Sequence, residues 1–84
     1  MVELKYSKHA LKCLRRMPKG HARKMHNALL KIAEGHNEGL DIKWMKNLNC
    51  YRLRLGNYRA QYEFLDAHPY MVVGKIGVRG GFYK

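Results

Sequence analysis

The chain has 84 residues, a formal net charge of +11 and a sequence pI of about 10.0. A hydrophobic fraction of 46% favours a folded protein over a disordered basic tail. The length allows one small domain, residues 1–84, with a single thin core. No long apolar span and no signal-peptide pattern are present, so the charge predicts nucleic acid or an acidic protein as the partner rather than a membrane.

The cysteines and histidines indicate neither a disulfide framework nor a metal site. Cys13 and Cys50 lie far apart and outside any CxxC motif. Two unpaired thiols are typical of the reducing cytoplasm, where we expect the protein to reside. The five histidines neither recur at i,i+4 spacing nor join the cysteines in a zinc pattern. We therefore expect no metal and no other cofactor.

The N-terminal half predicts a short strand and then two helices. Residues 2–6 alternate apolar and polar side chains, as a strand at a sheet edge or paired with a later strand does. Ser7 is a candidate N-cap for a first helix, which residues 17–20 (Met-Pro-Lys-Gly) end. Gly35 is a candidate C-terminal cap for a second helix. The apolar stripe of that second helix consists of Ala22, Met25, Leu29, Ile32 and Ala33.

The C-terminal half predicts consecutive strands joined by short turns. Residues 42–46 form one expected strand, and a turn at 47–49 separates it from a hairpin over residues 51–65. A turn at 66–69 leads to the most apolar strand, residues 70–76. The order βααββββ predicts an α+β domain in which the two helices, an αα-hairpin, pack on one face of a mainly antiparallel sheet.

The hairpin has a two-residue Gly-Asn turn at 56–57, and this turn fixes the register of its strands. Leu55 then faces Tyr58, and Arg54 faces Arg59. Like charges directly opposite each other across a ladder are destabilising, so this pair indicates a role in binding a polyanion. The expected apolar face comprises Tyr51, Leu53, Leu55, Tyr58, Ala60 and Tyr62, and the polar face comprises Arg52, Arg54, Arg59 and Gln61.

Strand parity extends the basic face beyond the hairpin. If Val72 and Ile76 face the helices, then Lys75 and Arg79 lie on the side of the hairpin arginines. This prediction requires a strand without a bulge at its glycines. Glu63 falls on the same side, where we interpret it as an ion-pair partner. The other large apolar residues, which are Met17, Met25, Trp44, Tyr62 and Phe64, are interpreted as core.

These residues resemble the RelE/ParE superfamily of bacterial and archaeal toxins. Residues 43–48 (KWMKNL) leading into residues 51–59 (YRLRLGNYR) look like the family's basic "KKL" stretch before a "YRLRxGxYR" hairpin. Residues 76–83 (IGVRGGFY) are similar to its closing "xGxRxxxY". Length and the order of the elements also fit, so the resemblance covers essentially the whole chain.

The resemblance implies the toxin of a type II toxin–antitoxin pair, which inhibits translation. In the RelE branch the toxin is a metal-independent endoribonuclease that cleaves mRNA in the ribosomal A site, where the ribose 2′-oxygen attacks the adjacent phosphate. By position, the residues that bind and stabilise the phosphate would be Arg52, Arg54, Arg59 and Arg79. Tyr83 lies near the family's C-terminal catalytic tyrosine and is expected to act in proton transfer or to stack on a base.

Lys43, Lys46 and Lys75 are the candidate contacts to the RNA backbone. The implied partners are a cognate antitoxin, acidic or amphipathic, and the mRNA with ribosomal RNA. A heterotetramer of toxin and antitoxin is one arrangement of that complex. The chain departs from branches that use a histidine or glutamate for proton transfer, since Val78 precedes Arg79. Two alternatives therefore stay open: a ParE-like inhibitor that binds DNA gyrase, and an RNA-binding module without catalysis.

Overall fold

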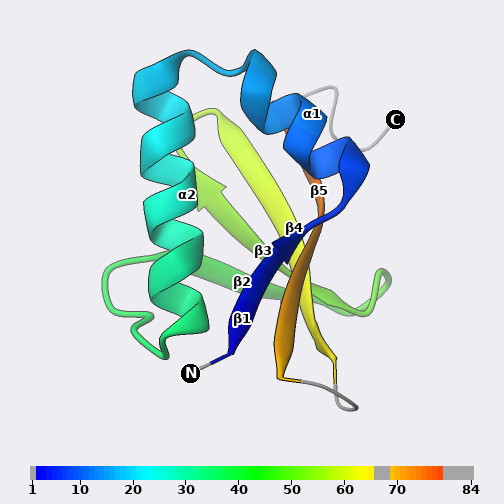
Figure 1. The fold of residues 1–84 in the computed structure, drawn as a ribbon. Coiled ribbons are helices and arrows are strands. Elements are labelled where there is room, and N and C mark those ends of the chain that lie inside the picture. The colour runs from blue at the N-terminus through cyan, green and yellow to red at the C-terminus, as the bar shows by residue number, and fades with distance from the viewer. Residues whose placement is uncertain (1, 66–68, 79–84) are drawn as a thin grey trace.

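The computed structural model describes residues 2–65 and 69–78. Both helices lie on one face of a mixed sheet of strand order β1-β5-β4-β3-β2 (Figure 1). Strands β1 and β5 run parallel, and the other neighbours are antiparallel. The predicted α+β fold and its order of elements are thus confirmed. Along the chain the elements are β1 (Glu3–Tyr6), α1 (Lys8–Arg16), α2 (Lys19–Ala33), β2 (Asp41–Met45), β3 (Cys50–Leu55), β4 (Tyr58–Leu65) and β5 (Tyr70–Val78).

The ends of the helices are set by the residues that the sequence indicated. The Oγ atom of Ser7 accepts a hydrogen bond from the backbone N–H of Ala10 at 3.0 Å, which caps α1. After α2, Gly35 has a φ of 87° and donates its N–H to the carbonyl of Ile32 at 3.0 Å. The N–H of His36 reaches the carbonyl of Lys31 at 2.8 Å. This pair of bonds is a Schellman motif, which requires the left-handed conformation that glycine adopts without strain.

The β3–β4 hairpin has the predicted register, with Leu55 opposite Tyr58 and Arg54 opposite Arg59. Its turn begins at Gly56, whose φ of 61° suits the first central position of a type II′ turn. Because side chains alternate between the faces of a sheet, this register places the six residues of the expected apolar face toward the helices, namely Tyr51, Leu53, Leu55, Tyr58, Ala60 and Tyr62.

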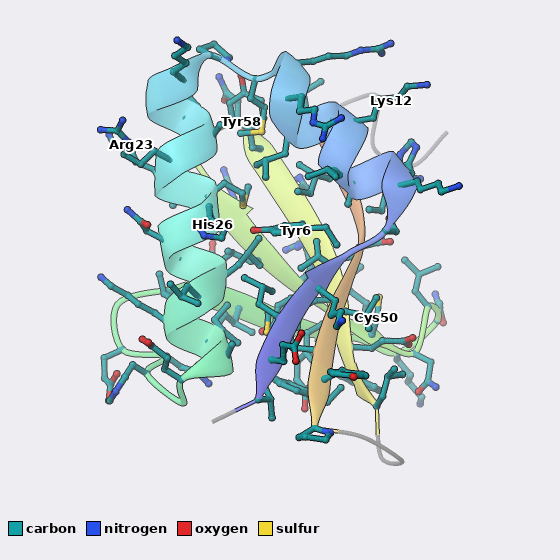
Figure 2. All side chains as sticks on the ribbon, viewed as in Figure 1. Tyr6, Lys12, Arg23, His26, Cys50 and Tyr58 are labelled. Carbon is teal, nitrogen blue, oxygen red and sulfur yellow. The ribbon has the colours of Figure 1, made fainter. Side chains whose placement is uncertain are left out.

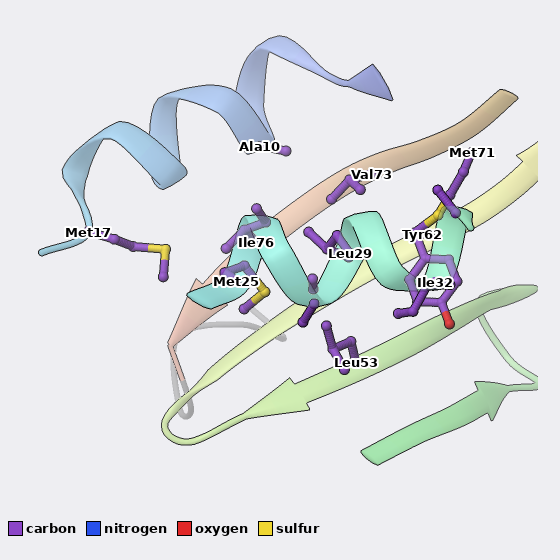
Figure 3. Packing of buried hydrophobic residues seen from close by; sticks show 13 residues of the cluster. Ala10, Met17, Met25, Leu29, Ile32, Leu53, Tyr62, Met71, Val73 and Ile76 are labelled. Carbon is purple, nitrogen blue, oxygen red and sulfur yellow. The ribbon is translucent and has the colours of Figure 1, made fainter. Parts of the chain in front are cut away.

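The core lies between α2, α1 and the helix-facing side of the sheet. Met25, Leu29 and Ile32 project from α2 toward the strands (Figure 3). The spacing of these three residues is the apolar stripe expected from the sequence. The sheet contributes Leu53, Ala60, Tyr62, Met71, Val73 and Ile76, and the helical side contributes Ala10, Met17, Ala28 and Ala33 in addition.

A bulge interrupts the pairing of β4 with β5. Gln61 pairs with Lys75, whereas the next residue, Tyr62, pairs with Val73. Gly74 is therefore an extra residue on β5, inserted between two regular stretches of ladder. Two hydrogen bonds from Ser7 hold this segment. Its N–H donates to the carbonyl of Val73 at 2.9 Å and its Oγ donates to the carbonyl of Gly74 at 2.8 Å.

The bulge overturns one expectation about β5. Val72 and Ile76 were predicted to share the helix-facing side, but the inserted residue reverses the parity between them. Met71 and Val73 are instead fully buried beneath the helices together with Ile76, and Val72 faces the opposite side of the sheet. Lys75 remains on the side of the hairpin arginines because it lies beyond the bulge, opposite Gln61.

Two aromatic residues expected in the core are exposed. Trp44 is 47% exposed and Phe64 is 44% exposed, whereas Tyr62 is buried as predicted. The rings of Trp44 and Tyr51 lie edge to face with centroids 4.9 Å apart, and Phe64 packs edge-on against Tyr62 at 5.9 Å. Both exposed rings thus face the helical side but lie beyond the cover of the helices, Trp44 on the edge strand β2 and Phe64 near the end of β4.

Candidate nucleic-acid interface

The sheet face opposite the helices, here called the helix-free face, has two adjacent rows of charged residues across β2, β3, β4 and β5. Residues directly opposite in a ladder share a face, so the register alone defines each row. The first row is Asp41, Arg54, Arg59 and Gly77. The second row is Lys43, Arg52, Gln61 and Lys75.

These rows bring together side chains that lie more than thirty residues apart in the sequence, from Lys43 to Lys75. Successive residues on one face of a strand are about 7 Å apart, so the rows are within the span of neighbouring RNA phosphates. Lys46 follows the end of β2 and is exposed in the turn before β3. The predicted candidates that share the face are Lys43, Arg52, Arg54, Arg59 and Lys75; their roles in catalysis and RNA binding remain predictions.

Two further candidates, Arg79 and Tyr83, lie outside the described residues. Their roles also remain predictions. The described part of β5 ends at Val78, directly before Arg79 and opposite Tyr58 of the hairpin. The first row thus ends at Gly77, two residues before Arg79 in the sequence.

Arg59 is the most unusual residue of the face. It is only 9% exposed, and it is the middle strand's contribution to the first row. No hydrogen-bond acceptor in residues 2–65 and 69–78 reaches its Nε atom. Arg54, a second cation, stands directly opposite. Burying a polar group without a hydrogen bond is unfavourable, so the Nε–H of Arg59 favours an acceptor from outside the described residues.

The other cations of the face differ in their surroundings. Arg54 and Lys43 are exposed, whereas Arg52 and Lys75 are half-buried and interact with other groups of the protein. Exposed guanidinium and ammonium groups attract a polyanion from a distance, and the half-buried ones hold a defined position. The face therefore combines exposed cations with half-buried ones.

Two acidic residues also lie on the helix-free face. Asp41 stands opposite Arg54, and Glu63 follows Gln61 by two residues on β4. The sequence suggested an ion pair for Glu63, but neither carboxylate forms a salt bridge within the described residues. Asp41 was missed altogether, because its position depends on the pairing of β2 with β3, which no turn motif fixes.

The histidines of the helices lie on the opposite side of the sheet from the arginines. The Tyr6 hydroxyl is 2.8 Å from Nδ1 of His26, and the two side chains point toward each other (Figure 2). Burial raises the pKa of Tyr6 to about 12. His21 packs its ring against Tyr58 with centroids 5.3 Å apart. These histidines therefore support the covered side of the domain.

One histidine and one cysteine meet on the first helix. His9 Nε2 and Cys13 Sγ lie 3.8 Å apart on α1, at i,i+4 spacing in the sequence. No group of three or more potential metal ligands occurs in residues 2–65 and 69–78. Cys13 and Cys50 are both free thiols, as expected. No helix among these residues is long and apolar enough to cross a membrane.

Comparisons with known proteins agree on one family, although no family model matches the chain. The chain is 34% identical over 80 residues to the Methanocaldococcus jannaschii protein named "Putative toxin RelE1", an alignment that covers 92% of this chain and 89% of that protein.

Solved structures give the same result. A chain of the RelE–RelB complex from Pyrococcus horikoshii superposes with a TM-score of 0.74 at 26% identity, covering 95% of this chain and 97% of that one. A chain of the RelB–RelE antitoxin–toxin complex from Methanococcus jannaschii gives a TM-score of 0.74 at 29% identity, covering 94% of each. The Escherichia coli RelBE complex, at 22% identity, shares the fold with a TM-score of 0.72 over 93% of this chain and 96% of its own.

Proposed function

The chain belongs to the RelE toxin family, and we propose that it is the toxin of a type II toxin–antitoxin pair and a metal-independent endoribonuclease. Its substrate is mRNA in the ribosomal A site, and its cleavage inhibits translation. The observation that carries this proposal is Arg59, a cation that is 9% exposed and whose Nε has no hydrogen-bond acceptor in the described residues. A phosphate supplies the missing charge, and a guanidinium holds two phosphate oxygens in its planar fork.

The reaction follows from the chemistry of RNA. The ribose 2′-oxygen attacks the adjacent phosphorus, the bond to the 5′-oxygen of the next nucleotide breaks, and the product carries a 2′,3′-cyclic phosphate. The 2′-hydroxyl proton leaves to a base, and the departing 5′-oxygen takes up a proton. In the transition state, negative charge develops on the phosphate oxygens, and fixed cations stabilise this charge. Arg52, Arg54, Arg59 and Arg79 are the proposed cations.

Proton transfer is the proposed role of Tyr83. A phenol surrounded by arginines has its pKa lowered, which is the direction that a general base requires. Stacking on an mRNA base is the alternative role of this ring. A Tyr83→Phe variant separates the two, because phenylalanine keeps the stacking surface and removes the hydroxyl. Loss of cleavage at unchanged RNA affinity assigns proton transfer, and retained cleavage assigns stacking.

The proposed protein partner is a cognate antitoxin with an acidic or amphipathic segment. Support comes from the relatives of known structure, which are complexes of RelE with RelB. The net charge of +11 gives such a segment a strong electrostatic attraction. We place the pair in the cytoplasm, where its substrate is found, and propose a heterotetramer as its resting form.

The test is a cell-free translation reaction in which primer extension maps the 5′ ends of the mRNA. We expect cuts at discrete positions within codons, and only when ribosomes are translating. Arg59→Ala should lower the cleavage rate by about 100- to 1000-fold, the typical loss for one group that stabilises transition-state charge. Arg23→Ala is the matched control, since Arg23 is exposed and projects from α2 away from the sheet (Figure 2).

If mRNA stays intact in the presence of the purified wild-type protein, the nuclease proposal is overturned. Inhibition of gyrase-dependent supercoiling by the same sample would then establish the ParE-like alternative. RNA binding with a log–log salt slope of roughly −3, the value for about four phosphate contacts on a single strand, but without cleavage would establish a non-catalytic RNA-binding module.

A further inference from the structure

The helix-free face has a second region beside its basic rows. A cavity of about 210 Å³ opens there between β3, β4 and β5. This volume is below the roughly 300 Å³ at which pockets for drug-sized molecules begin, so it suits one flat ring system rather than a whole nucleotide. The side chains around it belong to Leu48, Cys50, Gln61, Glu63 and Val72, and Gly74 forms part of the wall.

The cavity adjoins the second basic row directly. Gln61 belongs to both, because it pairs with Arg52 on one side and Lys75 on the other and also lines the cavity. Glu63 is the next residue of β4 on this face and pairs with Val72. Glu63 therefore lies about 7 Å along the strand from Gln61 of the second row, a separation that lets a base enter the cavity while its own phosphate lies on the arginines.

The walls of the cavity are mostly apolar and uncharged. The side chains of Leu48 and Val72 are aliphatic, and Cys50 is only 8% exposed. Burial, reinforced by the nearby Glu63 carboxylate, raises the pKa of the Cys50 thiol, so this wall stays neutral at physiological pH. A Cβ at Gly74 would meet nothing within 4 Å, so this part of the wall borders open space. A flat aromatic ring has suitable surfaces on which to pack here.

Glu63 determines which polar groups of a ligand the cavity accepts. It has no salt bridge within the described residues, and a carboxylate is unfavourable for the RNA backbone that the neighbouring rows attract. An ionised carboxylate only accepts hydrogen bonds. The group that it recognises must therefore present donors rather than phosphate oxygens.

We propose that this cavity binds a guanine base of the RNA and that Glu63 selects it. The Watson–Crick edge of guanine presents two adjacent donors, N1–H and the 2-amino group, which one carboxylate accepts together. The amide group of Gln61 donates to the neighbouring O6 atom. Adenine and cytosine each present a donor beside an acceptor on that edge, and uracil presents a single donor between two acceptors. Guanine alone matches a carboxylate with both of its donors.

This inference rests on the proposed function, and the test separates the two. The probes are three single-stranded RNA hexamers, UUGUUU, UUIUUU and UUAUUU, in which I is inosine, a guanosine without the 2-amino group. Fluorescence anisotropy measures the affinity of the full chain for each probe. We expect the guanosine hexamer to bind about tenfold more tightly than the inosine hexamer, since one hydrogen bond to a charged acceptor is lost, and more tightly still than the adenosine hexamer.

Two substitutions in the cavity sharpen the test. Glu63→Gln keeps the shape of the side chain but removes the pair of acceptor oxygens. The variant should therefore bind the guanosine and inosine hexamers with about equal affinity. Gly74→Ala places a methyl group in open space at the cavity wall and should weaken the guanosine hexamer without changing the adenosine hexamer. Glu38→Gln, in the exposed loop before β2, is the matched control and should keep the full preference.

The outcomes are distinct. Equal binding of the three hexamers by the wild type, or a guanosine preference that survives in Glu63→Gln, would overturn the base site and leave the proposed phosphate site intact. A preference for the adenosine hexamer would overturn the role of Glu63, because an amide such as Gln61 pairs with adenine through a donor and an acceptor. Failure of every hexamer to bind would overturn the base site, and the mRNA cleavage assay would still decide the nuclease proposal.

Discussion

The two faces of the same strands differ in how their buried groups are satisfied. On the helix-facing side, Leu53, Ala60 and Tyr62 are at most 2% exposed, and apolar contacts compensate their burial. On the helix-free face, Arg59 is nearly as buried but its Nε has no acceptor in the described residues. Burial alone therefore does not distinguish core from site. A buried polar group without a hydrogen-bond partner does distinguish them, because its burial lowers the stability of the fold unless a ligand binds it.

The largest expected effect concerns the covered face. Leu53→Ala removes a fully buried side chain from the centre of the core and should lower the free energy of unfolding by about 2–5 kcal/mol. Urea titration followed by circular dichroism measures it. Leu48→Ala is the matched control, since Leu48 is 50% exposed, and should change stability by less than about 0.5 kcal/mol. Similar losses in both variants would contradict the assignment of the two faces.

A smaller effect concerns the bulge at Gly74, which reverses the side-chain parity along β5. Ser7→Ala removes both the N-cap of α1 and the hydrogen bond to the Gly74 carbonyl, and should lower stability by about 1–2 kcal/mol. Ser7→Asp keeps a capping acceptor but cannot donate to that carbonyl at neutral pH. Its thermal midpoint should fall between those of the wild type and Ser7→Ala. A midpoint equal to the wild type would show that the bond at the bulge contributes nothing.

The smallest effect is confined to alkaline pH and again belongs to the covered face. Burial, with a lesser contribution from Tyr51, raises the pKa of Tyr62 from 10.0 to about 12. Its neutral form is thus favoured in the folded state, so this contribution to stability is complete below pH 10 and is lost as the pH rises to 12. Thermal unfolding of Tyr62→Phe should show a shallower decline over that interval than the wild type. Parallel curves would exclude Tyr62 as a cause.

Much of this fold follows from local sequence signals. Gly56 and the residue after it allow one tight turn, and that turn determines which hairpin residues face each other. Gly35 ends α2 for a similarly local reason. The cluster of Arg52, Arg54 and Arg59 could be predicted because it depends on the hairpin alone.

Features that depend on distant residues could not be predicted in the same way. The bulge at Gly74 is held by Ser7, 67 residues away, and it reversed the expected orientation of Val72. The exposure of Trp44 and Phe64 depends on how far the helices extend over the sheet. The burial of Arg59 likewise arises only once strands on both sides of β4 are in place.

The central claim is that the buried Arg59, whose Nε has no acceptor among the described residues, binds an RNA phosphate. The most direct test is the thermal unfolding of the wild type and Arg59→Met, each with and without a single-stranded RNA hexamer at about 100 times the wild-type Kd. We predict that Arg59→Met alone is at least as stable as the wild type, because an apolar side chain replaces a buried charge. RNA should raise the Tm of the wild type by about 10 °C or more and leave that of the variant unchanged. A less stable variant that RNA stabilises as much as the wild type would contradict the account.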